Sequence, residues 1–340
     1  MQQKIMLIGF GTVGQGLCEI LRDKGPQLKM EYDYQPMIVG VSDPRFGTIY
    51  NPAGFDLQSL LDQAAQGAFT SDLQGWDALG LITNGEADVV CELAFTDLTT
   101  GEPAISHCKA AFQSGKHVVT SNKGPAALMY DELMDMADSF DVDFLIEGTV
   151  MSGTPVLNLT EGPLAGNSIT AAKGILNGTT NYILTQMEAG MGYAEALQKA
   201  QELGYAEADP TGDVEGYDAR AKVTILANVV MDANLKIQDV ACKGISAITS
   251  EDIEKARAEN ARWKLVGSVE LTPGGVKASV QPEMIPMTHP LAAIMGATNA
   301  LTFTTDLLGD VTIVGPGAGR IETGYSILTD LLALESSDHE

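Results

Sequence analysis

The chain has 340 residues, of which 45% are hydrophobic and 19% charged, so it is long enough for two packed cores and shows no bias toward disorder. Its 20 basic and 45 acidic residues give a formal net charge of −25, which argues against nucleic acid or an anionic membrane surface as partner. No apolar run approaches membrane-spanning length and Met1 leads directly into a strand pattern, so we expect neither anchor nor signal peptide.

The cysteines are scattered and lack the paired spacing of metal or redox motifs. They are Cys18, Cys91, Cys108 and Cys242. Most of them fall in apolar segments, which predicts reduced thiols in a packed core and a cytoplasmic protein.

Residues 4–21 predict a dinucleotide-binding motif. They read as a short apolar strand, a glycine turn with Gly9, Gly11 and Gly14 in GxGxxG spacing, and an amphipathic helix. Glycines at these places allow a tight turn and the approach of a pyrophosphate to the helix N-terminus. A second strand ends at Asp43, where an acid would bond a ribose diol, while Arg45 could instead meet a 2′-phosphate. The choice between NAD and NADP stays open.

Alternating strands and helices continue to about residue 148, which predicts a doubly wound, Rossmann-like parallel sheet. After a loop from Gly47, we expect helices at 57–66, 102–114 and 125–139, and strands at 87–93, before Asn122, and at 142–148. Ligands in such sheets lie beyond the carboxyl ends of the strands, so Thr96 is expected near the cofactor and Lys123 beside nicotinamide or substrate. The plain alternative for Lys123 is a solvated loop residue.

A second, α+β domain with a mixed sheet is expected from 150 to 311, for substrate binding and for a homodimer. A hairpin is predicted around 272–275 and a further strand at 299–307. From 312 the chain again reads as strand, glycine turn and helix. We expect this part to return to the dinucleotide-binding domain of residues 1–149, with Gly317 close to the cofactor.

One wall of a substrate pocket is predicted at 174–184. This segment reads as a buried strand that turns into a helix at Thr179 or Thr180, and free backbone N–H groups at such a turn can hold a carboxylate. An ordinary N-capped helix is an equally good interpretation of the segment alone.

The opposite wall is predicted on a helix that begins near Val214, with Asp213 as its N-cap, and ends near Met231. Asp218 and Lys222 share one stripe of this helix with buried aliphatic residues, so both face inward. An ordinary i, i+4 salt bridge is the plain alternative. The acidic residues that we expect around the lysine are Glu207, Asp209, Asp213 and Asp218. Acids on one side and an anion site on the other suit a zwitterionic amino acid.

The most specific motifs are GYAEADPTGD and EGYDARAK between residues 200 and 222, together with GILNGTTNYIL, TSNKGP and GPGAG. Through them the chain resembles the homoserine dehydrogenases over nearly its whole length. The resemblance implies NAD(P)-dependent interconversion of L-homoserine and L-aspartate 4-semialdehyde, in the pathway to threonine and methionine. Since the chain stops at Glu340, we expect no regulatory ligand-binding domain.

The resemblance also implies roles for individual residues. It makes Lys222 and Lys123 catalytic and assigns the substrate to Glu207, Asp213 and Asp218. Gly178 and Thr179, at the turn described above, are expected to bind the substrate through their backbone N–H groups. It implies a monovalent cation held by main-chain oxygens of Glu147, Val150, Ser152 and Thr154, although Met151 and Ser152 stand where small residues are usual; a turn with no ion is the alternative. The expected cofactor-binding residues are Gly9, Gly11, Thr12, Val13, Gly14, Asp43, Arg45, Thr96, Lys123 and Gly317.

The chemistry of alcohol oxidation fits these residues, with Lys222 managing the hydroxyl proton directly or through a water. Two rival hypotheses are an amino-acid dehydrogenase acting on a C–N bond and a non-catalytic nucleotide-binding sensor. A ketimine-forming enzyme would not need the pocket lysine for the proton, and a sensor would not need Lys123, Asp218 and Lys222 together.

Overall fold

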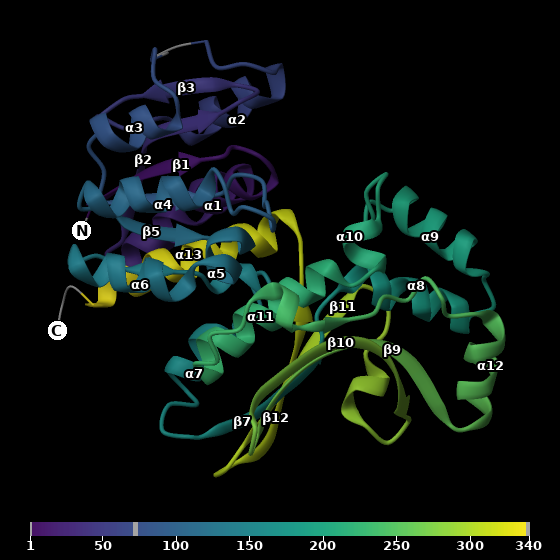
Figure 1. Ribbon diagram of the computed structural model, residues 1–340. Helices are drawn as coiled ribbons and strands as arrows, with labels where there is room; N and C mark the ends of the chain where they lie inside the picture. Colours follow the sequence, from purple (N-terminus) through teal and green to yellow (C-terminus); the bar gives the residue numbers. More distant parts are fainter. Residues whose placement is uncertain (1, 71–73, 338–340) are drawn as a thin grey trace. The chain divides into compact units, whose positions relative to one another are not determined.

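The computed structural model describes residues 2–70 and 74–337 (Figure 1). The chain forms two compact units: the residues up to Gly153 together with those from Gly319 onward, and the segment Thr154–Ala318. The chain thus crosses between the units after Gly153 and after Ala318, whereas the prediction placed the crossings before residues 150 and 312. Among the described residues, no helix is both long enough and apolar enough to cross a membrane.

The first unit is built on a six-stranded sheet with strand order β3-β2-β1-β4-β5-β6. All neighbours pair in parallel except β3, which pairs antiparallel with β2 at the edge. The prediction of a loop from Gly47 was therefore partly wrong, because the first residues of that segment form β3. The strands are β1 Gln2–Ile8, β2 Gln35–Asp43, β3 Gly47–Tyr50, β4 Val89–Glu92, β5 His117–Thr120 and β6 Phe144–Leu145.

Helices cover both faces of this sheet. One core joins α1, α2 and α13 to strand residues such as Leu7 and Cys91, whereas α3 packs from the other face, where Leu81 meets Gly40. The predicted helix at 125–139 is split at Met129, whose φ of −151° leaves the helical region. The helices are α1 Thr12–Tyr32, α2 Leu57–Gln66, α3 Ala78–Asn84, α4 Ala104–Gln113, α5 Lys123–Leu128, α6 Tyr130–Ser139, the 3-10 helix η1 Glu147–Thr149 and α13 Arg320–Ser337.

The C-terminal helix α13 is held against α1 by glycines on both helices. A Cβ atom at Gly16 would lie 2.0 Å from the carbonyl oxygen of Arg320, and one at Gly324 would lie 2.6 Å from the backbone nitrogen of Leu17. The Arg320 guanidinium also pairs with Glu19 across 2.7 Å. Glycine on each helix allows this close backbone approach, which fixes α13 beside α1.

The second unit carries a mixed sheet with strand order β12-β11-β7-β9-β10-β8, in which only β8 pairs in parallel. The hairpin predicted around 272–275 is confirmed, since β9 and β10 pair directly through it. The predicted return of the strand at 312 to the first domain was wrong, because β12 pairs along its length with β11. The strands are β7 Ile169–Ile175, β8 Ala241–Cys242, β9 Ala261–Thr272, β10 Gly275–Pro286, β11 Thr298–Thr305 and β12 Gly309–Pro316.

Helices α8, α11 and α12 lie along one side of this sheet, as Figure 1 shows. The α11 helix packs closely because Gly267 in β9 leaves room for the Val223 side chain. A small apolar cluster on the sheet includes Val266 and Leu291 of the 3-10 helix η3. The helices are α7 Leu157–Glu161, α8 Gly178–Glu188, α9 Tyr193–Glu202, α10 Thr211–Val214, α11 Tyr217–Met231, η2 Ile237–Asp239, α12 Ser250–Ala258 and η3 Pro290–Ala293.

Candidate active site

The glycine turn of the first unit has the geometry of a pyrophosphate cradle. Gly9 has a φ of +103°, and a Cβ there would lie 2.4 Å from the carbonyl oxygen of Leu93. A Cβ at Gly14 would lie 2.7 Å from the carbonyl oxygen of Gly9. Gly11 is the N-cap of the long helix α1 and provides no side-chain cap, so a ligand can approach the backbone there. This strand, turn and helix fit a dinucleotide phosphate.

Asp43 and Arg45 form one unit beside this turn. The Asp43 carboxylate accepts the Phe10 N–H at 2.8 Å, the Arg45 N–H at 2.9 Å, and the Arg45 guanidinium at 3.1 and 3.2 Å. Burial would raise the pKa of this carboxyl, but the guanidinium and the two N–H groups hold the pKa below its ordinary value. The Arg45 side chain is 62% exposed and lies over the Phe46 ring. Asp43 thus anchors the turn, and Arg45 presents a cation to solvent.

The carboxyl ends of β4 and β5 are joined by Asn122. Its side-chain amide donates to the carbonyl oxygens of Ala94 and Phe95 at 3.2 and 3.1 Å, just before Thr96. Its oxygen accepts the Gly124 N–H at 2.9 Å and so caps α5, whose first residue is Lys123. Thr96 and Lys123 therefore follow neighbouring strands at the edge where a doubly wound sheet binds ligands.

Lys222 is the buried cation of the second unit. Its Nζ lies 2.9 Å from Oδ2 of Asp218 and donates to the carbonyl oxygen of Leu176 at 2.8 Å. The side chain is 9% exposed, so the inward position predicted from the helix spacing is confirmed. The ammonium therefore bridges α11 to the end of β7.

Asn177 connects the acids to the start of α8, a role that was not predicted from the sequence. Its amide nitrogen donates to Asp213 at 2.7 Å and to Asp218 at 3.1 Å, while its oxygen accepts the Thr180 N–H at 2.9 Å as the N-cap of α8. The helix therefore begins at Gly178, slightly earlier than predicted. The strong preference of asparagine for the N-cap, at a strand-to-helix turn, was the available signal.

Asp213 is not the N-cap of α11, which corrects the prediction. It lies within the short helix α10, and Gly216, with a φ of +80°, separates α10 from α11. Burial, followed by the neighbouring charge of Asp218, raises the pKa of Asp213, and Asn177 and Lys222 counteract this rise. Asp213 on α10 and Asp218 on α11, on either side of this glycine turn, thus share the Asn177 amide.

The predicted ring of acids is only partly assembled in the second unit. Asp213 and Asp218 meet through Asn177, whereas Glu207 and Asp209 are exposed on the preceding turn, where Asp209 accepts the Thr211 N–H at 3.1 Å. The Thr179 hydroxyl donates to the carbonyl oxygen of Tyr205 at 2.6 Å and ties α8 to that turn. A substrate contact by Glu207 remains a prediction.

Gly317, which follows β12, and Gly178, at the start of α8, both lie against the Asn299 side chain. A Cβ at Gly178 would lie 3.3 Å from the Asn299 side-chain oxygen, and one at Gly317 would lie 2.0 Å from its nitrogen. Asn299 is fully buried, and neither polar atom of its side chain has a hydrogen-bond partner within the described part of the chain. Gly317 is therefore required for packing in the second unit, and its proximity to a cofactor remains a prediction.

The segment expected to hold a monovalent cation is buried. Val150 and Ser152 are at most 3% exposed, and Ser152 turns the chain with a φ of +56°. The Glu147 N–H donates to Asp330 at 3.0 Å, and the Thr154 hydroxyl donates to the carbonyl oxygen of Pro316 at 2.9 Å. Within residues 2–70 and 74–337 there is no cluster of three or more histidine, cysteine or acidic side chains for a metal ion. A cation here would need main-chain oxygens.

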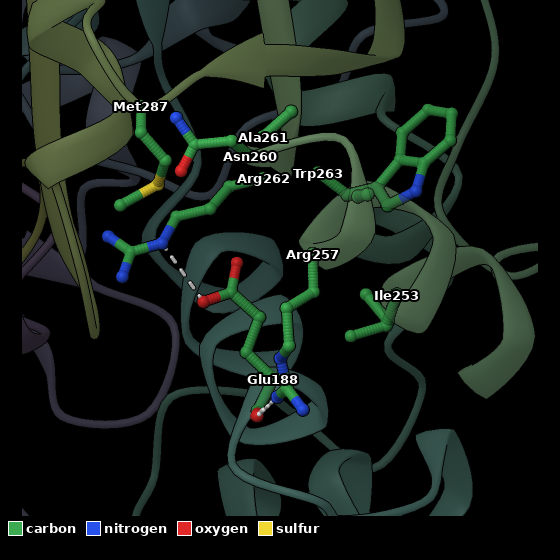
Figure 2. A pocket seen from close by; sticks show the side chains of 9 residues that line it. Glu188, Ile253, Arg257, Asn260, Ala261, Arg262, Trp263 and Met287 are labelled. Carbon is green, nitrogen blue, oxygen red and sulfur yellow. Dashed lines mark hydrogen bonds and ion pairs between the residues drawn. The ribbon is translucent and has the colours of Figure 1, made fainter.

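A separate pocket of about 160 Å³ lies between α8, α12 and the hairpin strands. Figure 2 shows that its charged groups are already paired: the Arg262 guanidinium meets Glu188 at 3.1 Å, and Arg257 donates to the Glu188 carbonyl oxygen at 2.6 Å. Neither Lys222 nor its acidic neighbours line this pocket. This pocket is therefore distinct from the site around Lys222.

Comparison with known proteins decides the family. The family described as "Homoserine dehydrogenase" matches residues 155–332, and "Homoserine dehydrogenase, NAD binding domain" matches residues 9–147. The chain belongs to the homoserine dehydrogenase family. It is 49% identical to an NAD(+)-dependent homoserine dehydrogenase of Pseudomonas canavaninivorans, over 99% of this chain and 97% of that protein.

Solved homoserine dehydrogenases share the fold. A structure from Thiobacillus denitrificans superposes with a TM-score of 0.87 at 30% identity, over 99% of this chain and 75% of that one. A hyperthermophilic archaeal homoserine dehydrogenase in complex with NADPH superposes with a TM-score of 0.83 at 29% identity, over 99% and 98% of the two chains. The chain is thus an NAD(P)-dependent oxidoreductase of amino-acid biosynthesis that interconverts L-homoserine and L-aspartate 4-semialdehyde.

Proposed function

We propose that Lys222 carries the proton chemistry of this homoserine dehydrogenase and that Asp213 and Asp218 bind the substrate ammonium. The observation that carries the proposal is the buried Lys222 Nζ, held at 2.9 Å by Asp218 beside the turn that begins α8. An ammonium has three N–H donors, and Asp218 and Leu176 engage two of them. The third is suited to the oxygen of the substrate.

The substrate is oriented by groups on both sides of Lys222. Two carboxylates sharing the Asn177 amide form a negative wall for the ammonium. The first turn of α8, at Gly178 and Thr179, offers backbone N–H groups for the substrate carboxylate. In the reducing direction a charged Lys222 polarises the aldehyde oxygen and then donates its proton. When bound, NAD(P)H would supply the hydride in this direction.

For the cofactor, we assign the pyrophosphate to the turn of Gly9, Gly11, Thr12, Val13 and Gly14. We assign the adenine ribose to the Asp43–Arg45 unit, with the exposed guanidinium as the partner of a 2′-phosphate and the carboxylate as that of a ribose diol. Thr96, Lys123 and Gly317 are assigned to the nicotinamide side. One relative is named NAD(+)-dependent and another was solved with NADPH. We propose that Arg45 sets the balance between the two cofactors.

The test of the catalytic assignment is Lys222→Ala, assayed by nicotinamide absorbance with homoserine and either cofactor. We expect kcat to fall by about 10²–10⁴-fold, the contribution of a positioned proton-transfer group, with cofactor affinity unchanged. Lys199→Ala is the matched control, because Lys199 pairs with Glu202 on an exposed helix face. Ordinary turnover by the Lys222 variant would refute the role.

A monovalent cation at the buried segment 147–154 is a further part of the proposal. The support is that the residues of this turn are buried and that main-chain carbonyl oxygens can replace the hydration shell of a monovalent cation. Activity in sodium, potassium and choline chloride at equal ionic strength tests it. Equal activity in all three salts argues against the cation.

We also propose a homodimer formed through the second unit. Its edge strand β12 carries Val314, which is 51% exposed, and the turn before it carries Leu307 and Leu308, which are 71% and 62% exposed. An exposed apolar edge is a template for pairing with another copy. Light scattering after size-exclusion chromatography should give twice the chain mass for the wild type and less for Val314→Lys. A monomeric wild type would contradict the dimer.

A further inference from the structure

Lys264 in β9 is a buried cation that the reaction described above does not use. It is 1% exposed. Its Nζ donates to the side-chain oxygen of Asn181 at 2.8 Å and to the carbonyl oxygen of Ile294, and lies 3.6 Å from the Met295 sulfur. All three of these partners are neutral. Burying an ammonium among neutral groups is costly, so such a residue needs a reason other than packing.

The charges around Lys264 do not neutralise it directly. Burial lowers the pKa of Lys264 to about 8, while the charge of Glu188 raises the pKa and that of Arg262 lowers it. Glu188 is itself paired with Arg262 at 3.1 Å (Figure 2). Across the hairpin, Glu283 on β10 is paired with Lys173 of β7 at 2.8 Å. Lys264 therefore depends on its neutral partners to remain charged.

Those partners lead to the first turn of α8. The Asn181 amide nitrogen donates to the carbonyl oxygens of Ile294 and Thr298 at 3.3 and 3.1 Å, and the Asn181 N–H donates to the carbonyl oxygen of Asn177 at 3.3 Å. The segment 294–298 then touches the helix start, where a Cβ at Gly178 would lie 2.5 Å from the carbonyl oxygen of Ala297. Lys264 thus holds both the helix and the segment that supports it.

We propose that Lys264 is a positioning residue for the substrate pocket. Its ammonium clamps Asn181 and the 294–298 segment, and this clamp fixes the turn at Asn177 and Gly178 against which homoserine binds. The inference rests on the proposed function, because it takes that turn to hold the substrate carboxylate. Lys264 itself touches neither substrate nor cofactor.

The first experiment replaces Lys264 by methionine and measures both KM values and kcat at pH 7. We expect the KM for homoserine to rise about tenfold, the factor that corresponds to ~1.4 kcal/mol, while the KM for the cofactor stays within about twofold and kcat within about threefold. Lys173→Met is the matched control, because it removes a partly buried lysine from the same sheet whose ion-pair partner is Glu283. An unchanged KM for homoserine in a folded Lys264→Met protein overturns the proposal.

A second variant keeps the proposal testable if Lys264→Met does not fold. Asn181→Ala removes the amide through which the clamp acts, so it should raise the KM for homoserine similarly. The double variant should be no worse than the more affected single variant, because both act through one contact. Additive effects, or equal losses in both KM values, contradict the clamp.

The pH profile gives a readout that a merely structural lysine would not change. Deprotonation near pH 8 turns charge-assisted hydrogen bonds into weaker neutral ones, so the wild-type KM for homoserine should rise between pH 7 and 9. Lys264→Met should lack this additional rise. The result is separable from the catalytic assignment, since Lys222→Ala changes kcat and Lys264→Met changes KM.

Discussion

The Asn177 amide and the Asp213 carboxylate are joined by a hydrogen bond of 2.7 Å, and the same amide nitrogen lies 3.1 Å from Asp218. One neutral donor thus stands between two acids that would otherwise repel each other. Because Asn177 is also the N-cap of α8, the position of the acids and the start of the helix depend on one side chain.

The first prediction concerns the substitution Asn177→Ala. The lost cap should destabilise the fold by about 1 kcal/mol, and the released carboxylates should raise the KM for homoserine about tenfold. Asp56→Ala is the matched control, because Asp56 caps α2 by accepting the Ser59 N–H at 2.8 Å. Thermal unfolding and steady-state kinetics on both variants should show similar stability losses and a KM change only at Asn177. Equal KM values in the two variants would remove Asn177 from the pocket.

Helix periodicity was sufficient to predict the inward face of α11, because Asp218 and Lys222 are one turn apart on the same helix. It could not predict Asn177 as a partner of the acids, because that contact joins residues 36 and 41 positions apart. The position of β12 was missed for a different reason. It pairs with β11 in a local hairpin closed at Thr305 and Gly309, but the strand was read together with the glycine turn and helix that follow it. Local patterns therefore predicted the elements better than they predicted the contacts between them.

The second prediction concerns pH and stability at Asp213. Its pKa is raised in the folded state above the ordinary value of 3.8. Between the ordinary and the raised pKa, the folded state therefore binds more protons than the unfolded state. Stability therefore falls as pH rises through this window, and the cost persists at neutral pH. Asp213→Asn removes that cost and should raise the melting temperature at pH 7, while weakening homoserine binding.

Two measurements check the Asp213 prediction. Melting curves from pH 3.5 to 7 should diverge in favour of Asp213→Asn as pH rises, and the wild-type KM for homoserine should increase on acidification as Asp213 becomes protonated. Asp209→Asn is the control, since Asp209 is exposed and its pKa is lowered by the Thr211 contacts. A wild type that is more stable than Asp213→Asn at pH 7 would show that the carboxylate stabilises the fold.

The third prediction concerns cofactor choice at Arg45. Arg45→Ala removes the exposed cation beside the glycine turn and also removes two guanidinium contacts from Asp43, at 3.1 and 3.2 Å. An adenine 2′-phosphate then loses its counterion, whereas a ribose diol gains access to carboxylate lone pairs. The ratio of kcat/KM for NADP to that for NAD should therefore fall by about tenfold or more, in line with the loss of one charge-assisted contact.

Arg22→Ala is the control for Arg45, because it removes an arginine on α1 that pairs with its neighbour Asp23 at 2.7 Å. The Arg22→Ala variant should leave the ratio of kcat/KM for NADP to that for NAD unchanged at every ionic strength. In the wild type, added salt should weaken NADP binding more than NAD binding, since only the former has the extra ion pair to screen. If Arg45→Ala lowers kcat/KM for both cofactors equally, the guanidinium acts by holding Asp43 and the glycine turn in place, and the selectivity must reside elsewhere.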